Sequence, residues 1–376
     1  MKIGKIKVKH YINYVAISAI IGVFGGIILT GGRLDNSTLF LLEKMAISII
    51  LAVSLSLVVG FLGELSLGHA GFMCVGAYLG GKVSALLVPT MGNGIEALLI
   101  SLLVGAAAAA VCGIIIGIPA LRLRGDYLAI VTLAFGEIVK SLFQNSSDES
   151  FGGSLGLSTP RYDKRYLFII AFVLVLVTLA VVQNLMRSKH GRAITAIRDN
   201  EIAARATGAN VTKYKLLAFT LSATFAGIAG VLYSYSNYTV QSMKFGYNYS
   251  IEILVMVVLG GMGNINGSII AAALITYLNT KLATVLTGDM AVLQNLLYAL
   301  ILIVIVIYNN APALKGFRDK YSISAFIEKH KKNNDPSNVK DDKAKWDVVP
   351  TKISMDEILS VDLVPQDSAY DEGGEK

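Results

Sequence analysis

Apolar residues gather in long runs along this chain, and charged residues fall mainly between the runs. A run of about 20 apolar residues can cross the hydrocarbon core of a bilayer as a helix. The run 249–263 is short and rich in glycine, so it also fits a half-helix or re-entrant segment. The pattern predicts an all-α, polytopic membrane protein with ten spans, at 11–30, 45–62, 70–88, 97–118, 126–143, 165–186, 214–236, 249–263, 267–287 and 291–308.

Ten spans divide into two sets of five. An odd number of spans in each half places the second half upside down relative to the first. Such inverted repeats are common in transporters, where broken helices at the repeat interface surround the substrate route. The two halves share no convincing sequence match. Inverted five-helix halves with broken helices are therefore a hypothesis that rests on the count alone.

The two ends of the chain differ from the apolar middle, residues 11–308. Residues 1–10 are basic and precede the first apolar run, as in a signal peptide, but no small-residue cleavage site follows that run. We therefore expect a retained first helix. Residues 309–376 are polar, and acids outnumber bases from Asp335 onward. This segment has too few apolar residues to form a core, which predicts a disordered tail.

The charge distribution predicts the orientation. The chain is 16% charged, against about 25% in soluble proteins. Its net charge of +7 comes from basic residues that flank the apolar runs, at the N-terminus, at Arg122 and Arg124, and in the loop 187–213. The loop 145–163 is mainly acidic. Basic loops stay on the cytoplasmic side, so both termini are expected in the cytoplasm, which requires an even number of spans. This distribution disfavours a nucleic-acid partner.

The sequence contains no enzyme site that we can assign. Cys74 and Cys112 lie in apolar runs, and the four histidines are scattered. The stretch Gly76–Val83 resembles a phosphate-binding loop, but Val83 replaces the hydroxyl residue and the stretch lies in an apolar run rather than after a strand. We therefore expect no catalytic residue, no metal ion and no cofactor bound by this chain.

A glycine-rich stretch between two spans, Gly63–Phe72, is a candidate broken helix. Ionisable groups at membrane depth are costly and usually face a protein interior or a solute pathway. The alternative is a cytoplasmic turn in which these groups are hydrated. In the fifth span, Glu137 and Lys140 share one helix face, which fits an ion pair or part of a substrate or proton route. The candidate translocation path comprises Glu64, Ser66, Gly68, His69, Gly71 and Glu137.

The loop 187–213 carries the clearest functional signal. Asp199 or Asn200 can cap a short amphipathic helix, and Gly208 can end it. A short helix with small apolar residues is suited to the groove of a partner protein. The candidate docking residues are Glu201, Ile202, Ala203, Ala204 and Gly208.

These residues resemble the EAA-Gly loop by which permeases of ATP-binding-cassette (ABC) importers dock on their ATPase subunits. The surrounding sequence is similar to LivM-type permeases of branched-chain amino acid importers, from about residue 45 to 308 but not in the acidic tail. The stretches that carry this resemblance are Arg192–Ala204, Ser66–Phe72, Leu123–Glu137, Gly152–Leu157 and Val258–Gly263.

The resemblance implies a multi-pass permease subunit of the cell (inner) membrane that forms half of a translocation path. It also implies a second related permease, two ATPases that bind ATP and Mg, and an extracytoplasmic solute-binding protein. One alternative is a sugar or nucleoside permease of the same superfamily. Another is an ion-coupled secondary transporter, which would leave the loop Glu201–Gly208 unexplained.

Overall fold

The computed structural model describes residues 12–29, 35–92, 94–123, 125–160, 162–285, 299–300 and 303. All of them belong to one compact unit, Met1–Asn309. The predicted basic N-terminus, the tail 309–376, Arg124 and most of the predicted span 291–308 lie outside the described residues.

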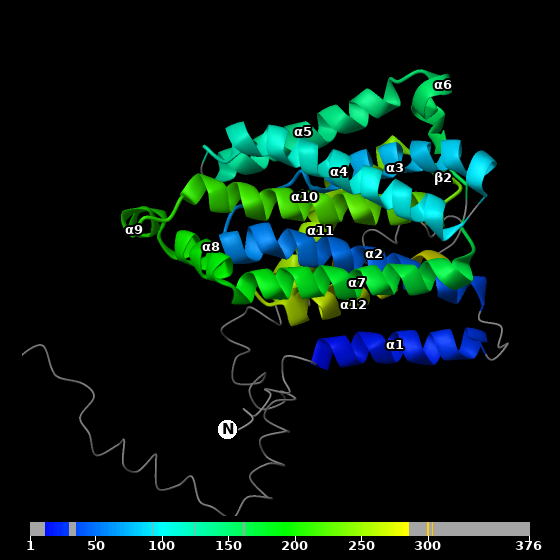
Figure 1. Cartoon of the computed structure of the whole chain (residues 1–376), viewed down its shortest axis with the longest axis horizontal. Coiled ribbons are helices and arrows are strands. Elements are labelled where there is room, and N and C mark those ends of the chain that lie inside the picture. Colours follow the sequence, from blue (N-terminus) through cyan, green and yellow to red (C-terminus); the bar gives the residue numbers. More distant parts are fainter. Residues whose placement is uncertain are drawn as a thin grey trace, which may run out of the picture. The chain divides into compact units, whose positions relative to one another are not determined.

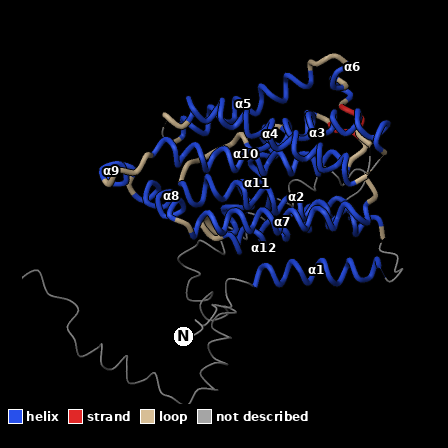
Figure 2. Tube along the Cα trace, viewed as in Figure 1, coloured by secondary structure: helices blue, strands red, loops and turns tan. Residues whose placement is uncertain are grey.

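The described part of the chain is mainly helical (Figures 1 and 2). The α-helices are α1 (Ile12–Leu29), α2 (Asn36–Ser56), α3 (His69–Met91), α4 (Ile95–Ala120), α5 (Asp126–Gln144), α6 (Asp148–Phe151), α7 (Lys164–Arg187), α8 (Lys189–Asp199), α9 (Glu201–Ala206), α10 (Val211–Ser236), α11 (Tyr247–Gly260) and α12 (Ile265–Val285). A π-helix, Leu57–Leu62, continues α2. Short 3-10 turns cover Gly153–Leu155 and Ser242–Phe245, and strands β1 (Leu157–Ser158) and β2 (Thr239–Val240) pair antiparallel.

Six helices of the described residues are long and apolar enough to cross a membrane: Asn36–Leu62, His69–Met91, Ile95–Ala120, Tyr166–Arg187, Val211–Ser236 and Ile265–Val285. The prediction of an all-α polytopic membrane protein is thereby confirmed. The count of ten spans and the inverted halves are not confirmed. At 14 residues α11 is about 21 Å long, too short to span alone, which agrees with the half-helix alternative.

The second helix begins earlier than the apolar run predicts. The run was expected to start at residue 45 because Glu43 and Lys44 precede it, yet α2 begins at Asn36. Glu43 is buried, and the hydroxyl of Ser236 donates to its carboxylate over 2.5 Å. The Lys44 ammonium lies 4.6 Å from the centre of the Phe40 ring. Contacts with Ser236 and Phe40 thus accommodate these two charges within the helix.

Small residues bring α3, α4 and α10 together at the centre of the bundle. A Cβ on Gly76 of α3 would overlap the carbonyl oxygen of Gly227 on α10. Close approach of this kind is typical of packed membrane helices. Gly76–Val83, the stretch that resembles a phosphate-binding loop, lies within α3, so packing accounts for its glycines. The Lys82 ammonium donates to the backbone oxygen of Glu149.

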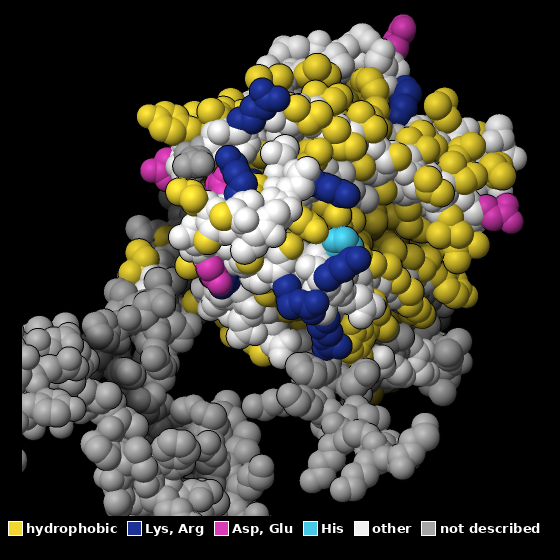
Figure 3. All heavy atoms as spheres, turned by 60° about the vertical axis from the view of Figure 1, so that its left-hand side comes forward, with side chains coloured by type: hydrophobic (Ala, Val, Ile, Leu, Met, Phe, Trp, Pro, Cys, Tyr) yellow, Lys and Arg dark blue, Asp and Glu magenta, His cyan; other side chains and the backbone are white. Residues whose placement is uncertain are grey.

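The helices lie roughly side by side, so the unit has two ends. Helices α8 and α9 lie at one end, at the left of Figure 1, and α6 lies at the other. Figure 3 brings the first end forward and shows Lys and Arg side chains spread across it, with apolar side chains on the flank. We call the two ends of the unit the α8–α9 end and the α6 end. The Lys and Arg residues of α8 and α9 are Lys189, Arg192, Arg198 and Arg205, and Arg187 ends α7 directly before them.

Candidate functional site

Two short helices, α8 and α9, form a compact element between the long helices α7 and α10. The Ser188 hydroxyl caps α8 by accepting from the backbone N–H groups of His190 and Gly191. At Asn200 the backbone becomes extended, with φ −158° and ψ 106°, and this ends α8. The Asn200 side-chain oxygen then accepts from the N–H groups of Ile202 and Ala203, 3.0 Å away in each case. Of the two predicted caps, Asn200 is the one that starts α9.

Gly208 ends α9, as predicted. Its φ of +88° is left-handed, a conformation that glycine adopts without strain. The N–H of Ala209 donates back to the oxygen of Ala204 over 3.1 Å, which completes a Schellman-type ending. Asn210 then caps α10 by accepting from the N–H of Lys213. Local sequence signals therefore fix the shape of the whole element.

The two helices pack against the rest of the chain through one apolar face. Ile194 and Ile197 of α8 and Ala204 of α9 form a cluster with residues of the π-helix and α10. Ala204 is only 4% exposed. The predicted docking surface is therefore divided, because Ala204 packs on its own chain while Ala203 is exposed. Ile202 is 74% exposed and is the large apolar residue on the outer face of α9.

A buried ammonium group joins α9 to the segment that follows α2. The Lys215 side chain is 4% exposed, and its Nζ lies 2.5 Å from Glu64 Oε1 and 3.3 Å from Glu201 Oε2. The other oxygen of Glu201 accepts from the Arg205 guanidinium over 2.9 Å. A buried charge is tolerated only when it is well paired. Two carboxylates from separate segments supply that pairing here.

Arg198 makes a second connection to the same segment. Its guanidinium donates to the backbone oxygen of Gly60 in the π-helix over 3.2 Å and also pairs with Asp199. Gly63 ends the π-helix with φ +77°, and a Cβ there would lie 2.7 Å from Arg198 Cγ. Only glycine therefore fits both the backbone conformation and the space beside Arg198 at this position.

A polar cleft of about 410 Å³ lies where these segments meet. It is lined by Leu62, Gly63, Glu64, Gly125, Ile197, Arg198, Asp199, Asn200, Glu201, Ile202 and Lys215. The cleft thus brings Glu64 from the candidate path together with Glu201 and Ile202 from the docking loop. Sequence analysis assigned these residues to two separate sites.

The chain is not helical from Gly63 to Gly68, where a break was predicted. His69 and Ser66 are buried, so they are not in a hydrated turn. A ring nitrogen of His69 lies 2.9 Å from the hydroxyl of Ser54, which precedes the π-helix Leu57–Leu62 that continues α2. The chain therefore returns into the bundle before α3 begins. Side-chain hydroxyls of neighbouring helices satisfy its backbone, since Thr132 accepts from the N–H of Leu67. Irregular backbone at membrane depth needs such cover.

The remaining candidate path residues lie on the contact between α3 and α5. A Cβ on Gly68 would overlap the oxygen of Thr132, and one on Gly71 would lie 2.8 Å from Gly136 Cα. Further along α5, Glu137 accepts from Lys140 over 2.6 Å and from the N–H of Tyr247 over 2.9 Å. Its side chain is 33% exposed. Glu137 thus holds the start of α11, apart from Glu64.

Comparison with known proteins identifies the family. The sequence profile described as "Branched-chain amino acid transport system / permease component" matches residues 37–306. The chain belongs to this permease family. It is 36% identical over 288 residues to the high-affinity branched-chain amino acid transport permease LivM of Salmonella typhimurium, covering 68% of this chain and 65% of that protein. LivM of Escherichia coli is 35% identical over 275 residues, covering 65% and 62%.

A more distant relative is the ribose import permease RbsC of Escherichia coli, 28% identical over 202 residues, which cover 50% of this chain and 57% of that protein. The alignments span less than two thirds of the length of the two LivM proteins. No solved structure matches the chain.

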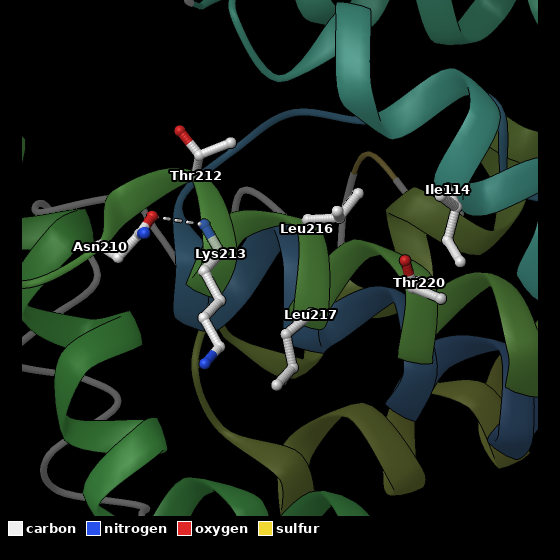
Figure 4. A pocket seen from close by; sticks show the side chains of 7 residues that line it. All are labelled: Ile114, Asn210, Thr212, Lys213, Leu216, Leu217 and Thr220. Atoms are coloured by element: carbon white, nitrogen blue, oxygen red, sulfur yellow. Dashed lines mark hydrogen bonds between the residues drawn. The ribbon is translucent and has the colours of Figure 1, made fainter.

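The permease also has a wider surface groove, of about 700 Å³, between α4 and α10 (Figure 4). Most of its exposed surface is apolar, with Ile114 from α4 and Leu216 and Leu217 from α10. The other lining residues are Asn210, Thr212, Lys213 and Thr220. None of the candidate site residues lines it. An apolar lining on the flank of two spans suits lipid or another apolar helix better than a charged solute.

Sequence analysis of the permease missed two residues of the site, Arg198 and Lys215. Arg198 was counted only as a positive charge of the loop 187–213, and Lys215 was not singled out. Lys215, however, falls inside the predicted span 214–236, and an ionisable residue within a span is itself a sign of function. Arg198 offered no comparable signal, because its partner is a backbone oxygen that is distant in sequence.

Proposed function

We propose that this chain is the membrane-spanning subunit of an ATP-driven importer of branched-chain or related amino acids. The observation that carries the proposal is the α8–α9 element. It is capped at both ends, lies at the basic end of the bundle, exposes Ile202, and connects through Lys215 and Arg198 to a broken membrane helix. The family and the names of the LivM relatives support the solute class.

In this proposal the outer face of α9 docks on an ATPase. Ile202 and Ala203 enter a groove of the ATPase, Glu201 and Ala204 hold α9 on the permease, and Gly208 shapes the turn. The basic residues favour a cytoplasmic location for this end, where ATP is available. Both chain termini lie on that side. Two ATPases carry ATP and Mg, and this chain binds neither a cofactor nor a metal ion.

A second, related permease completes the translocation path, and an extracytoplasmic binding protein delivers the solute. Glu137 is the candidate path residue best placed to face that second subunit, because its carboxylate is partly exposed. The other candidate path residues are less exposed or tightly packed, and they support the residues that line the path. They are Glu64, Ser66, Gly68, His69 and Gly71. Thus the polar break supports the path without being its open surface.

Two alternative functions can be compared with this proposal. One alternative is a sugar or nucleoside permease of the same superfamily, and the ribose import permease relative supports a sugar as the solute. An ion-coupled secondary transporter would need no ATPase, and it would leave the exposed Ile202 and the caps of α9 without a purpose. The two alternatives differ in the solute and in the energy source, so one reconstituted system separates them.

The test is uptake into proteoliposomes that contain this chain, its partner permease, the ATPases and the binding protein. We expect ATP-dependent uptake of radiolabelled leucine, isoleucine or valine, and none with a non-hydrolysable ATP analogue. Uptake of ribose in place of leucine would support the sugar alternative. Uptake that follows an ion gradient without ATP would overturn the proposal.

A further inference from the structure

Three segments that are distant in sequence meet at the α8–α9 end. The π-helix Leu57–Leu62 contacts α8 through Arg198. Glu64, two residues after the π-helix, contacts Lys215 of α10, which also contacts Glu201 of α9. The turn between α11 and α12 lies against the same π-helix, since a Cβ on Gly60 would lie 2.5 Å from the nitrogen of Gly263. The segment that follows α2 is thus in contact with α8, α10 and the turn between α11 and α12.

We propose that Lys215 and Arg198 are positioning residues that transmit movement of α9 to the broken end of α2, at Leu57–Gly68. This inference rests on the proposed function, because it assumes that an ATPase moves α9. It goes further by assigning the internal link to two cations and their partners in this chain.

The first step of the argument concerns Lys215. Its ammonium is shared by Glu64 and Glu201, so those two carboxylates are held on one buried charge although they belong to different segments. If α9 shifts, Glu201 shifts with it. The ammonium of Lys215, whose side chain is 4% exposed, must then follow Glu201 and leave Glu64, or remain with Glu64 alone. Glu201 keeps Arg205 as a partner, so the cost of breaking this buried pairing falls on Lys215 and Glu64. Displacement of α9 therefore acts directly on Glu64.

The second step concerns the receiving segment. Leu57–Leu62 is a π-helix, a form that is rare and usually limited to single turns at functional positions. It leads directly into the non-helical stretch 63–68, which carries the buried Ser66 and precedes His69. A pull on Gly60 through Arg198 and on Glu64 through Lys215 acts on both sides of Gly63. The break at 63–68 is therefore the segment that these contacts can move.

The third step concerns the connection from the break to the rest of the bundle. Leu67 donates to Thr132 of α5, and Ala70 donates to Ser250 of α11. The same α5 carries Glu137, which holds the start of α11 through the N–H of Tyr247. Movement of the break thus reaches both helices beside the partly exposed Glu137.

The experiment uses the full complex in proteoliposomes, with ATP hydrolysis and uptake of radiolabelled leucine measured on the same samples. The test variants are Lys215→Met, Glu64→Gln and Arg198→Gln. Lys213→Met is the matched control, because Lys213 lies two residues away on α10 and is exposed. For each test variant we expect normal co-purification of the ATPases and an about tenfold lower ratio of leucine taken up to ATP hydrolysed. The control keeps the wild-type ratio.

Two further variants separate transmission from plain structural support. Lys215→Arg keeps the charge and is expected to restore most of the ratio. The double variant Glu64→Gln with Lys215→Met is expected to lose no more than the worse single variant, because both changes break one connection. If Lys215→Met fails to reach the membrane, Arg198→Gln and Glu64→Gln decide, since they leave the buried ammonium in place.

A wild-type ratio of uptake to hydrolysis in Glu64→Gln and Arg198→Gln would overturn the inference. A ratio that falls equally in Lys213→Met would also overturn it, because the effect would then belong to any charge at this end. Failure of the wild-type chain to bind ATPases at all would instead refute the proposed function.

Discussion

Individual polar residues are buried in this chain beside partners that are distant in sequence. Lys215 meets Glu64, Ser236 meets Glu43, and His69 meets Ser54. In an apolar interior, a polar group that lacks a partner costs more than the hydrogen bond returns, so such pairs specify which helices meet. The sequence shows that these residues are unusual in apolar runs. It does not show their partners, because nothing local constrains a contact across the bundle.

The contact between Glu43 and Ser236 gives a prediction about stability. Replacement of Ser236 by Ala removes the 2.5 Å hydrogen bond to a buried carboxylate, at a cost of about 1–3 kcal/mol. We expect a lower midpoint of thermal unfolding in detergent. Ser150→Ala is the control, because Ser150 is exposed and hydrogen-bonds only to another exposed serine. Equal midpoints for the two variants would show that the pair contributes nothing.

Ile202 gives a prediction about docking. Aspartate at this exposed position leaves the packing of the chain intact but puts a charge where an apolar groove is expected. Loss of one well-placed anchor in an interface should lower co-purified ATPase by about tenfold. The quantity to measure is the ATPase retained per permease after affinity purification. Leu155→Asp serves as control, since Leu155 is 77% exposed but ends the 3-10 turn Gly153–Leu155 that follows α6. Unchanged retention in Ile202→Asp would place the docking surface elsewhere.

At the scale of elements, the α8–α9 segment shows what sequence can predict. The boundaries of α9 follow from Asn200 and Gly208, whose preferences act within a few residues and can be read from the sequence. The helix α8, capped by Ser188, was not predicted. The orientation of its faces was not readable. Ala203 and Ala204 look equivalent in sequence, yet Ala204 packs against the π-helix cluster and Ala203 faces outward. That difference depends on the angle at which α9 meets α10, which is a property of the tertiary structure.

Gly208 gives a prediction about this element. Valine there must adopt a left-handed backbone, which costs about 1–2 kcal/mol, although the surrounding space is open. We expect the end of α9 to distort and both ATPase binding and uptake to fall. Gly92→Val is a closely matched control, with φ +78° and open space, at the end of α3 away from the docking element. If both variants lose uptake equally, backbone strain alone explains the effect.

At the scale of the whole molecule, apolar runs predicted the class of fold and the position of most helices. Their failures have physical causes. The start of α2 was missed because Glu43 and Lys44 look too polar for a span until their partners are known. The run 249–263 was counted as a span, but α11 has only 14 residues and begins beside Glu137 on α5. Apolar runs occur both in helices buried within protein and in helices that cross the lipid. The run alone therefore does not distinguish a half-helix from a membrane span.

Orientation in the membrane is the property of the whole molecule on which the proposed coupling depends. We predict that the α8–α9 end faces the cytoplasm because of its basic residues. Cys74 and Cys112 are first replaced by Ala, and single cysteines are then introduced by Ser154→Cys near the α6 end and Lys189→Cys in α8, both at exposed positions. In intact cells, a membrane-impermeant thiol reagent should label Ser154→Cys and leave Lys189→Cys unlabelled.

After the membranes are permeabilised, both variants should be labelled, which controls for the reactivity of each thiol. Labelling of Lys189→Cys in intact cells would place α8 and α9 outside, away from ATP. The exposed face of α9 could not then meet an ATPase, and the links through Lys215 and Arg198 could not transmit its movement. The orientation therefore decides whether the residues and elements described above can work as one coupling route.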